Sequence, residues 1–137
     1  MGTALRLPAT RVHRDIAAPA GAVWDLLIDV RAWPQWGPSV RRAVLDGDGT
    51  RLERGSRGTV WTVAGVRLPF AVCSFDPGRH WSWRVAGVRA TGHTVTPRAG
   101  GCRVAFEVPW WAPVYLTVCA VALERIEKMA VAREQPG

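Results

Sequence analysis

Two residues of this sequence carry side chains suited to proton exchange with a bound molecule, His93 and Tyr115. His93 shares the parity of Val95 on an expected strand, so its side chain is expected to point inward. There it is either a buried, hydrogen-bonded histidine or a proton donor or acceptor for a ligand oxygen. Tyr115, the single tyrosine, either packs in the core with one hydrogen bond or offers its hydroxyl to a ligand carbonyl.

No further pattern in the chain indicates catalysis or a bound cofactor. The sequence has no GxSxG, HExxH or P-loop motif, no dinucleotide fingerprint and no cluster of carboxylates. Arg14 shares a face with Val12 and Ile16, where its charge needs either a partner or a ligand anion. We therefore expect no metal and no cofactor, and the sequence does not demonstrate an enzyme.

The three cysteines, Cys73, Cys102 and Cys119, lie far apart and lack CxxC spacing. This distribution predicts buried, reduced thiols without a disulfide framework or metal site, and it favours a cytoplasmic protein. The N-terminal segment also lacks the apolar stretch of a signal peptide.

The net charge of +7 does not define a nucleic-acid-binding protein. Lys128 is the one lysine among 18 basic residues, and the arginines are scattered apart from small groups within residues 41–57. Diffuse charge of this kind does not outline a phosphate-binding surface, so we expect no specific nucleic-acid partner. With 137 residues, 48% of them hydrophobic, the chain is expected to form one globular domain.

The elements that must position His93 and Tyr115 follow from the periodicity of apolar residues. A strand is expected over residues 10–17, a helix over 19–29, and a short helix or turn over 29–39 that packs Trp33 and Trp36 nearby. Further strands are expected over 40–45, 57–64, 66–75, 80–88, 90–97 and 102–108. The turns between them include Asp46-Gly47-Asp48-Gly49, Asp76-Pro77-Gly78 and Ala99-Gly100-Gly101, so sequential antiparallel pairing is expected.

Residues 108–133 are apolar on every side up to Leu123 and amphipathic beyond it, and they predict a long terminal helix that begins near Pro113. A helix of this kind lies either in a membrane or inside a protein. The apolar run is shorter than the roughly 20 residues that span a bilayer, so we expect a buried helix and no membrane span. The row facing the sheet is expected to be either Val114, Val118 and Val121 or Tyr115, Cys119 and Ala122.

Several short sequence motifs occur in order along the chain. They are Ile16-Ala17-Ala18-Pro19 before Val23-Trp24-Asp25-Leu26-Leu27, Asp29 with Trp33-Pro34-Gln35-Trp36, the strand opening at Gly58, Asp76-Pro77 before a Trp-rich strand, and Gly100-Gly101 with Val104. This order resembles the START-like (SRPBCC, birch-pollen-allergen-like) superfamily, in its polyketide cyclase/dehydrase-like branch. The resemblance implies an α+β helix-grip fold in a single domain, residues 1–137 with a core of about 10–133. A curved antiparallel sheet of six to seven strands would wrap a long C-terminal helix, with two short helices after the first strand.

The resemblance also implies a cavity between the sheet and the terminal helix. Eight tryptophans are far above ordinary usage, and they either fill the core or wall this cavity. The residues expected to contact a ligand are Trp33, Trp36, Trp61, Phe70, Trp81, Trp83, His93, Phe106, Trp111 and Tyr115.

One predicted function is the binding of a hydrophobic or aromatic small molecule, such as a polyketide, quinone or lipid-like compound. The alternative is an aromatase/cyclase-like enzyme that cyclises and dehydrates a bound polyketide chain, with His93 and Tyr115 as catalytic residues. Neither the ligand nor the oligomeric state follows from the sequence.

Overall fold

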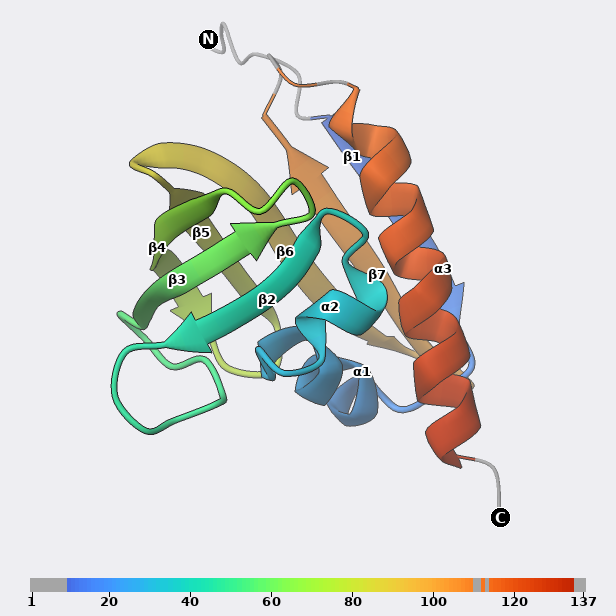
Figure 1. Cartoon of the computed structure of the whole chain (residues 1–137). Helices are drawn as coiled ribbons and strands as arrows, with labels where there is room; N and C mark the ends of the chain where they lie inside the picture. The colour runs from blue at the N-terminus through green and yellow to red at the C-terminus, as the bar shows by residue number, and fades with distance from the viewer. Residues whose placement is uncertain (1–9, 110–111, 113, 135–137) are drawn as a thin grey trace, which may run out of the picture.

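A computed structural model describes residues 10–109, 112 and 114–134. In this part of the chain, seven strands form one antiparallel sheet in the order β1-β7-β6-β5-β4-β3-β2, accompanied by three helices (Figure 1). The strands are β1 Thr10–Ile16, β2 Val40–Leu45, β3 Arg57–Thr62, β4 Arg67–Asp76, β5 His80–Val85, β6 Val88–Arg98 and β7 Gly101–Val108. The helices are α1 Ala20–Ile28, α2 Trp33–Trp36 and α3 Tyr115–Glu134. This is the α+β helix-grip architecture that the sequence predicts.

The two short helices are attached to each other through tryptophan side chains. The indole N–H groups of Trp33 and Trp36 in α2 donate to the carbonyl oxygens of Leu27 and Leu26 in α1, each at 2.9 Å. Leu26 and Leu27 are themselves buried in the core. Because these hydrogen bonds join the last turns of α1 to α2, both tryptophans are held in fixed positions over the sheet.

The long helix α3 lies along β1 and β7 (Figure 1). Its buried residues are Cys119, Ala122, Leu123, Ile126 and Ala130. Val114 is 81% exposed and Val121 37% exposed. Of the two rows considered, the one with Cys119 and Ala122 therefore faces the sheet. The apolar residues before Leu123 do not bury the helix on every side, because α3 packs through one face only. Within the described part of the chain, none of the helices has the length and apolarity to traverse a bilayer.

Arg14 has the partner that its inward position requires. Its Nε donates to Oε1 of Glu127 at 2.7 Å, and both side chains are partly buried. This ion pair joins β1 to the second half of α3. Because carboxylate and guanidinium satisfy one another, the position needs no ligand anion.

Two connections differ from the turns that the sequence predicts. The β5–β6 hairpin turns at Ala86-Gly87, earlier than expected, and both residues have positive φ (52° and 78°). An alanine rarely adopts that conformation, so its residue type gave no signal for the turn. Between β2 and β3, residues 46–56 form a long connection in place of a tight turn. Leu52 is buried within it, and its N–H donates to the Ile28 carbonyl at 2.8 Å.

The cysteines are all free, but they are not all buried. Cys102 and Cys119 are buried, as expected, whereas Cys73 is exposed. Cys73 follows Val72, which points into the core, so the alternation of a strand directs Cys73 to the outer face. Burial raises the pKa of the Cys102 thiol, and it raises that of Cys119 to about 11.

Candidate ligand-binding cavity

Two adjoining cavities lie between the inner face of the sheet, the α2–β2 segment and the start of α3. The outer chamber has a volume of about 430 Å³, and the inner chamber has about 40 Å³. They share the lining residues Ser39, Val40, Trp83, Thr91 and Tyr115. Val63 and Val88 also line the outer chamber, and they are 63% and 51% exposed, so this chamber reaches the surface.

The outer chamber is lined mainly by aliphatic side chains from several strands. They include Val60 of β3, Leu68 of β4, Val85 of β5 and Val108 of β7. Arg89 is the one charged residue among the described residues of its lining. An apolar chamber with few polar groups is the usual form of a site for an apolar ligand.

Four aromatic side chains pack against one another beside the inner chamber. Trp33 stacks on Trp81 with ring centroids 5.5 Å apart and planes within 4°. Trp83 meets both of these rings edge-on, and Phe70 meets Trp33 and Trp83, with ring centroids 5.2 to 5.8 Å apart. Because Trp33 and Trp81 are almost fully buried by these contacts, most of their surface packs in the core and only a small part borders the inner chamber.

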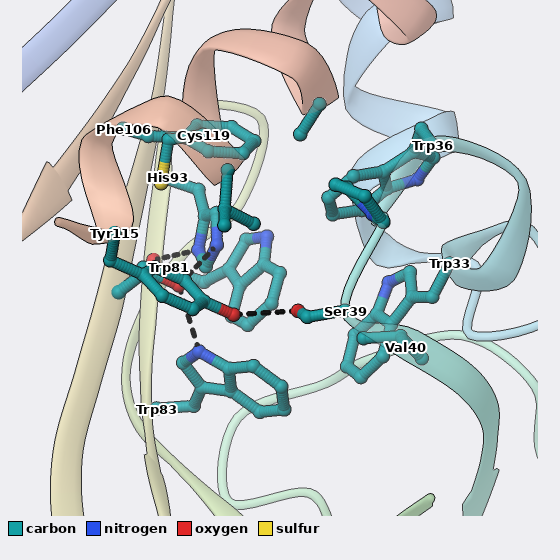
Figure 2. Close-up of a pocket in the computed structure, with 15 residues that line it drawn as sticks. Trp33, Trp36, Ser39, Val40, Trp81, Trp83, His93, Phe106, Tyr115 and Cys119 are labelled. Carbon is teal, nitrogen blue, oxygen red and sulfur yellow. Dashed lines mark hydrogen bonds between the residues drawn. The ribbon is translucent and has the colours of Figure 1, made fainter. Parts of the chain in front are cut away.

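His93 belongs to a chain of hydrogen bonds that uses both of its ring nitrogens. Trp83 Nε1 donates to Thr91 Oγ1 at 3.0 Å, Thr91 Oγ1 lies 2.9 Å from His93 Nε2, and His93 Nδ1 lies 3.2 Å from the Trp81 carbonyl (Figure 2). A carbonyl can only accept, so Nδ1 carries a proton, and in the neutral ring Nε2 accepts the hydroxyl proton of Thr91. Both ring nitrogens are therefore occupied, and neither is free for a ligand.

The surroundings of His93 keep it uncharged. The side chain is buried, stacks on Trp81 at 3.9 Å and meets Phe106 edge-on at 4.7 Å. Desolvation is the largest cause that lowers its pKa, from the ordinary 6.5 to about 3, and it outweighs the raising effect of the Trp81 carbonyl. A histidine with this pKa does not exchange protons efficiently near neutral pH.

Tyr115 stands where the two chambers meet. Its hydroxyl lies 2.6 Å from Oγ of Ser39, a hydrogen bond that joins the first turn of α3 to the residue before β2 (Figure 2). Both residues line both chambers. Unlike His93, this pair has hydroxyl groups that can exchange their mutual bond for one to a ligand oxygen.

The structure brings together most of the residues expected to contact a ligand, although the space beside them is small. Those that line the inner chamber are Trp33, Trp36, Trp81, Trp83, His93, Phe106 and Tyr115. Phe70 packs behind them in the aromatic cluster. The expectation that Trp61 lines the cavity is wrong, because its inward neighbour Val60 takes the lining position and Arg42 covers the Trp61 ring at 4.8 Å. Trp111 lies outside the described residues.

Alternation along the strands predicts that the aliphatic residues of the outer chamber point inward. It does not predict the chamber itself, because alternation alone cannot distinguish a residue that packs from one that faces a void. Ser39 was also missed, since a serine beside a proline reads as part of a turn. Among the described residues, no group of three histidine, cysteine or acidic side chains is placed to hold a metal ion.

The fold is shared with solved bacterial proteins. A protein of Mesorhizobium loti superposes with a TM-score of 0.71 at 17% identity, covering 94% of this chain and all of the other. A protein of Thermobifida fusca gives 0.67 at 21% identity, covering 94% and 97%. A protein of Nitrosomonas europaea gives 0.68 at 14% identity, covering 92% and 96%. At these identities the likeness concerns the fold alone.

No curated protein matches the chain. The family model described as "Polyketide cyclase / dehydrase and lipid transport" matches residues 8–132, which is nearly the whole sequence. Together with the helix-grip fold, this match shows that the chain belongs to the polyketide cyclase/dehydrase and lipid transport family of the START-like superfamily.

Proposed function

We propose that the protein binds a hydrophobic small molecule of the polyketide, quinone or lipid-like type, with its apolar part in the outer chamber. The observation that carries the proposal is a surface-connected chamber of about 430 Å³ with a mainly aliphatic lining. This volume falls within the roughly 300–1,000 Å³ of small-molecule sites. The family description, which includes lipid transport, supports the same function.

The lining favours an alkyl chain over a large flat ring system. The aromatic side chains of the cluster that would stack on a flat ligand are packed on one another, and of these only Trp83 borders the outer chamber, together with Tyr115. The remaining wall is built mostly of valine, leucine and alanine. We further place the protein in the cytoplasm, a proposal that its free cysteines support.

A blocking substitution tests this function. Val85 is half-buried on the wall of the outer chamber, so Val85→Trp places a large ring inside the chamber. Val44 lies on an exposed strand position, so Val44→Trp is the matched control. We expect fatty acyl and prenyl quinone probes, measured by equilibrium dialysis, to bind the natural protein and the control equally. Binding to Val85→Trp should fall at least about tenfold because the chamber is filled. Equal binding by all three proteins would rule out this chamber.

The second candidate function is cyclisation and dehydration of a bound polyketide chain. The observation in its favour is that His93 and Tyr115 border the same inner chamber. The occupied nitrogens and lowered pKa of His93 leave Tyr115 as the group able to exchange a proton with an enol or carbonyl. Tyr115→Phe should then abolish turnover of a poly-β-keto thioester while changing its binding only a few-fold. Unchanged turnover in that variant would remove this candidate.

A further inference from the structure

Trp81, whose side chain lines the inner chamber, carries a hydrogen-bond donor that has no partner. Among the buried side-chain nitrogen and oxygen atoms of the described residues, Nε1 of Trp81 makes no hydrogen bond. The side chain is 1% exposed, so bulk water does not reach it. A buried N–H without an acceptor is costly, and native proteins almost always satisfy such groups.

The packing of Trp81 prevents it from finding an acceptor by moving. Its indole stacks on both Trp33 and His93, with centroid distances of 5.5 and 3.9 Å. Figure 2 shows the indole nitrogen directed toward the middle of the side chains that surround the inner chamber. The acceptor for this donor therefore has to come from whatever occupies the chamber.

The other polar groups of the chamber already have partners. Thr91 and His93 satisfy one another and the groups beside them, and Ser39 is bonded to Tyr115. The space of about 40 Å³ admits an oxygen atom and one or two attached carbons, since a single water requires roughly 10–15 Å³ by this measure. The site thus has one free donor and room for one small group.

The lining of the inner chamber does not suit a charged group. No lysine, arginine or acidic residue is among the described residues that line the inner chamber. A carboxylate placed there would lack a counter-charge in an apolar environment, which is strongly unfavourable. Arg89, the charged residue of the cavity system, lies on the outer chamber.

We propose that the inner chamber binds one neutral acceptor oxygen, a ketone or aldehyde carbonyl at the end of the ligand, with Trp81 Nε1 as its donor. This inference rests on the proposed function, because the apolar remainder of the ligand occupies the outer chamber. The two chambers adjoin at Ser39 and Tyr115, so the end group reaches Trp81 by displacing their mutual hydrogen bond. The ligand class is an alkyl chain that ends in an uncharged carbonyl.

A pair of isosteric probes tests the assignment. Methyl octyl ketone is compared with the alkene in which a methylene group replaces the carbonyl oxygen. Trp81→Phe keeps an aromatic ring and removes the donor. We expect the ratio of ketone affinity to alkene affinity to fall about fivefold in Trp81→Phe, the effect of one neutral hydrogen bond. Decanoate, whose carboxylate has its counter-charge at Arg89, should bind the natural protein and Trp81→Phe equally.

The matched control is Trp24→Phe, because Trp24 is a buried tryptophan that packs on Phe75 and lines neither chamber. Its ketone-to-alkene ratio should equal that of the natural protein. An unchanged ratio in Trp81→Phe overturns the inner site and leaves the proposed function standing. Failure of both probes to bind the natural protein, by contrast, contradicts the proposed function itself.

A measurement on the natural protein keeps the proposal testable if Trp81→Phe does not fold. In a ¹⁵N-labelled sample, the indole proton of Trp81 is assigned through its nuclear Overhauser effects to the His93 ring. The ketone should move this resonance downfield as a hydrogen bond forms, and the alkene should not. The same shift with both probes, or with neither while both bind, overturns the assignment.

Discussion

The histidine that looks most reactive in the sequence is a neutral packing residue in the structure. Its imidazole lies between Trp81 and Phe106, and its two nitrogens join Thr91 to the backbone of β5. The ring and the threonine hydroxyl thereby fix the wall of the inner chamber. Replacing a donor or acceptor in this series of hydrogen bonds leaves a buried polar group unpaired, which lowers the free energy of unfolding by about 1–3 kcal/mol.

The lowered pKa of His93 predicts how stability depends on pH. The folded protein holds the ring neutral down to pH about 3, whereas the unfolded chain protonates it near 6.5. As the pH falls below 6.5, the unfolded state binds a proton on His93 and the folded state does not, so the free energy of unfolding decreases. Between pH 6.5 and 4.5 the free energy of unfolding should fall by about 2 kcal/mol, measured by urea titration.

Two variants identify the source of this slope. His93→Gln should remove most of the decrease between pH 6.5 and 4.5. His13→Gln, at an exposed strand position, should keep it. Hydrogen bonds from Arg103 and Arg31 lower the pKa values of Asp15 and Asp29. Protonation of these two carboxylates therefore lowers the stability of the protein only at more acid pH. A slope that persists in His93→Gln would contradict the neutral, buried state of the ring.

The cysteines give a second prediction at the residue scale. Cys73 is exposed, while Cys102 and Cys119 are buried with raised thiol pKa values, so their thiolate forms are rare at neutral pH. An aromatic disulfide reagent should therefore modify one thiol rapidly in the native protein and the other two only on unfolding. Cys73→Ser should eliminate the rapid phase. Two or more rapid thiols in the folded protein would show that the core around α3 opens.

Among the elements, the sheet depends on one glycine in β3. Gly58 pairs with Leu45 on one side and Phe70 on the other. A Cβ at Gly58 would collide with the Val44 carbonyl and lie 2.8 Å from the Phe70 ring. The Phe70 ring therefore covers the glycine, and it can join the aromatic cluster only because no side chain occupies that space.

Gly58→Ala should destabilise the fold by about 3 kcal/mol because strand or ring must shift. Gly21→Ala in α1 is the control, since a Cβ there meets nothing within 4 Å. Alanine is the better helix former, so that variant should be neutral or slightly more stable. Denaturant unfolding compares the two. A Gly58→Ala protein of normal stability would mean that β3 and β4 are less closely packed than described.

The orientation of α3 is tested by two truncations of side chains on opposite faces. Ile126 is fully buried, so Ile126→Ala should cost about 3 kcal/mol of unfolding free energy. Val121 lies on the partly exposed face, so Val121→Ala should change stability by less than about 0.5 kcal/mol. Comparable losses in both variants would contradict the orientation of α3, because they would show that Val121 is packed as closely as Ile126.

The strands and helices show which features of the fold the sequence predicts. Alternation predicts the strands and the inward rows, because a strand directs neighbouring side chains to opposite faces. It places His93 inward correctly and also explains why Cys73 points out. It does not show whether Trp33 and Trp81 leave a space between them, because that depends on how closely α2 approaches the sheet. The outer chamber is lined by residues from several strands and connections, so no single segment predicts it.

At the scale of the whole molecule, α3, the aromatic cluster and the outer chamber occupy different parts of the inner face of the sheet. α3 covers the β1–β7 side, and the aromatic cluster fills the middle. The outer chamber forms beyond them, against β3, β4 and β5, with Tyr115 at its boundary. Proteins that share this fold can therefore bind different ligands, because side chains and not the topology determine the size of the chamber.

The claim that the outer chamber receives an apolar ligand is tested most directly by contacts between protein methyl groups and a bound probe. Methyl octyl ketone is titrated into protein with ¹³C-labelled valine and leucine methyls. The account predicts saturable shifts and intermolecular Overhauser effects at Val60, Leu68 and Val85, and none at the exposed Val66 outside the chamber. Saturable binding whose contacts fall on Val66 or elsewhere on the outer surface, with none at the three lining residues, would contradict it.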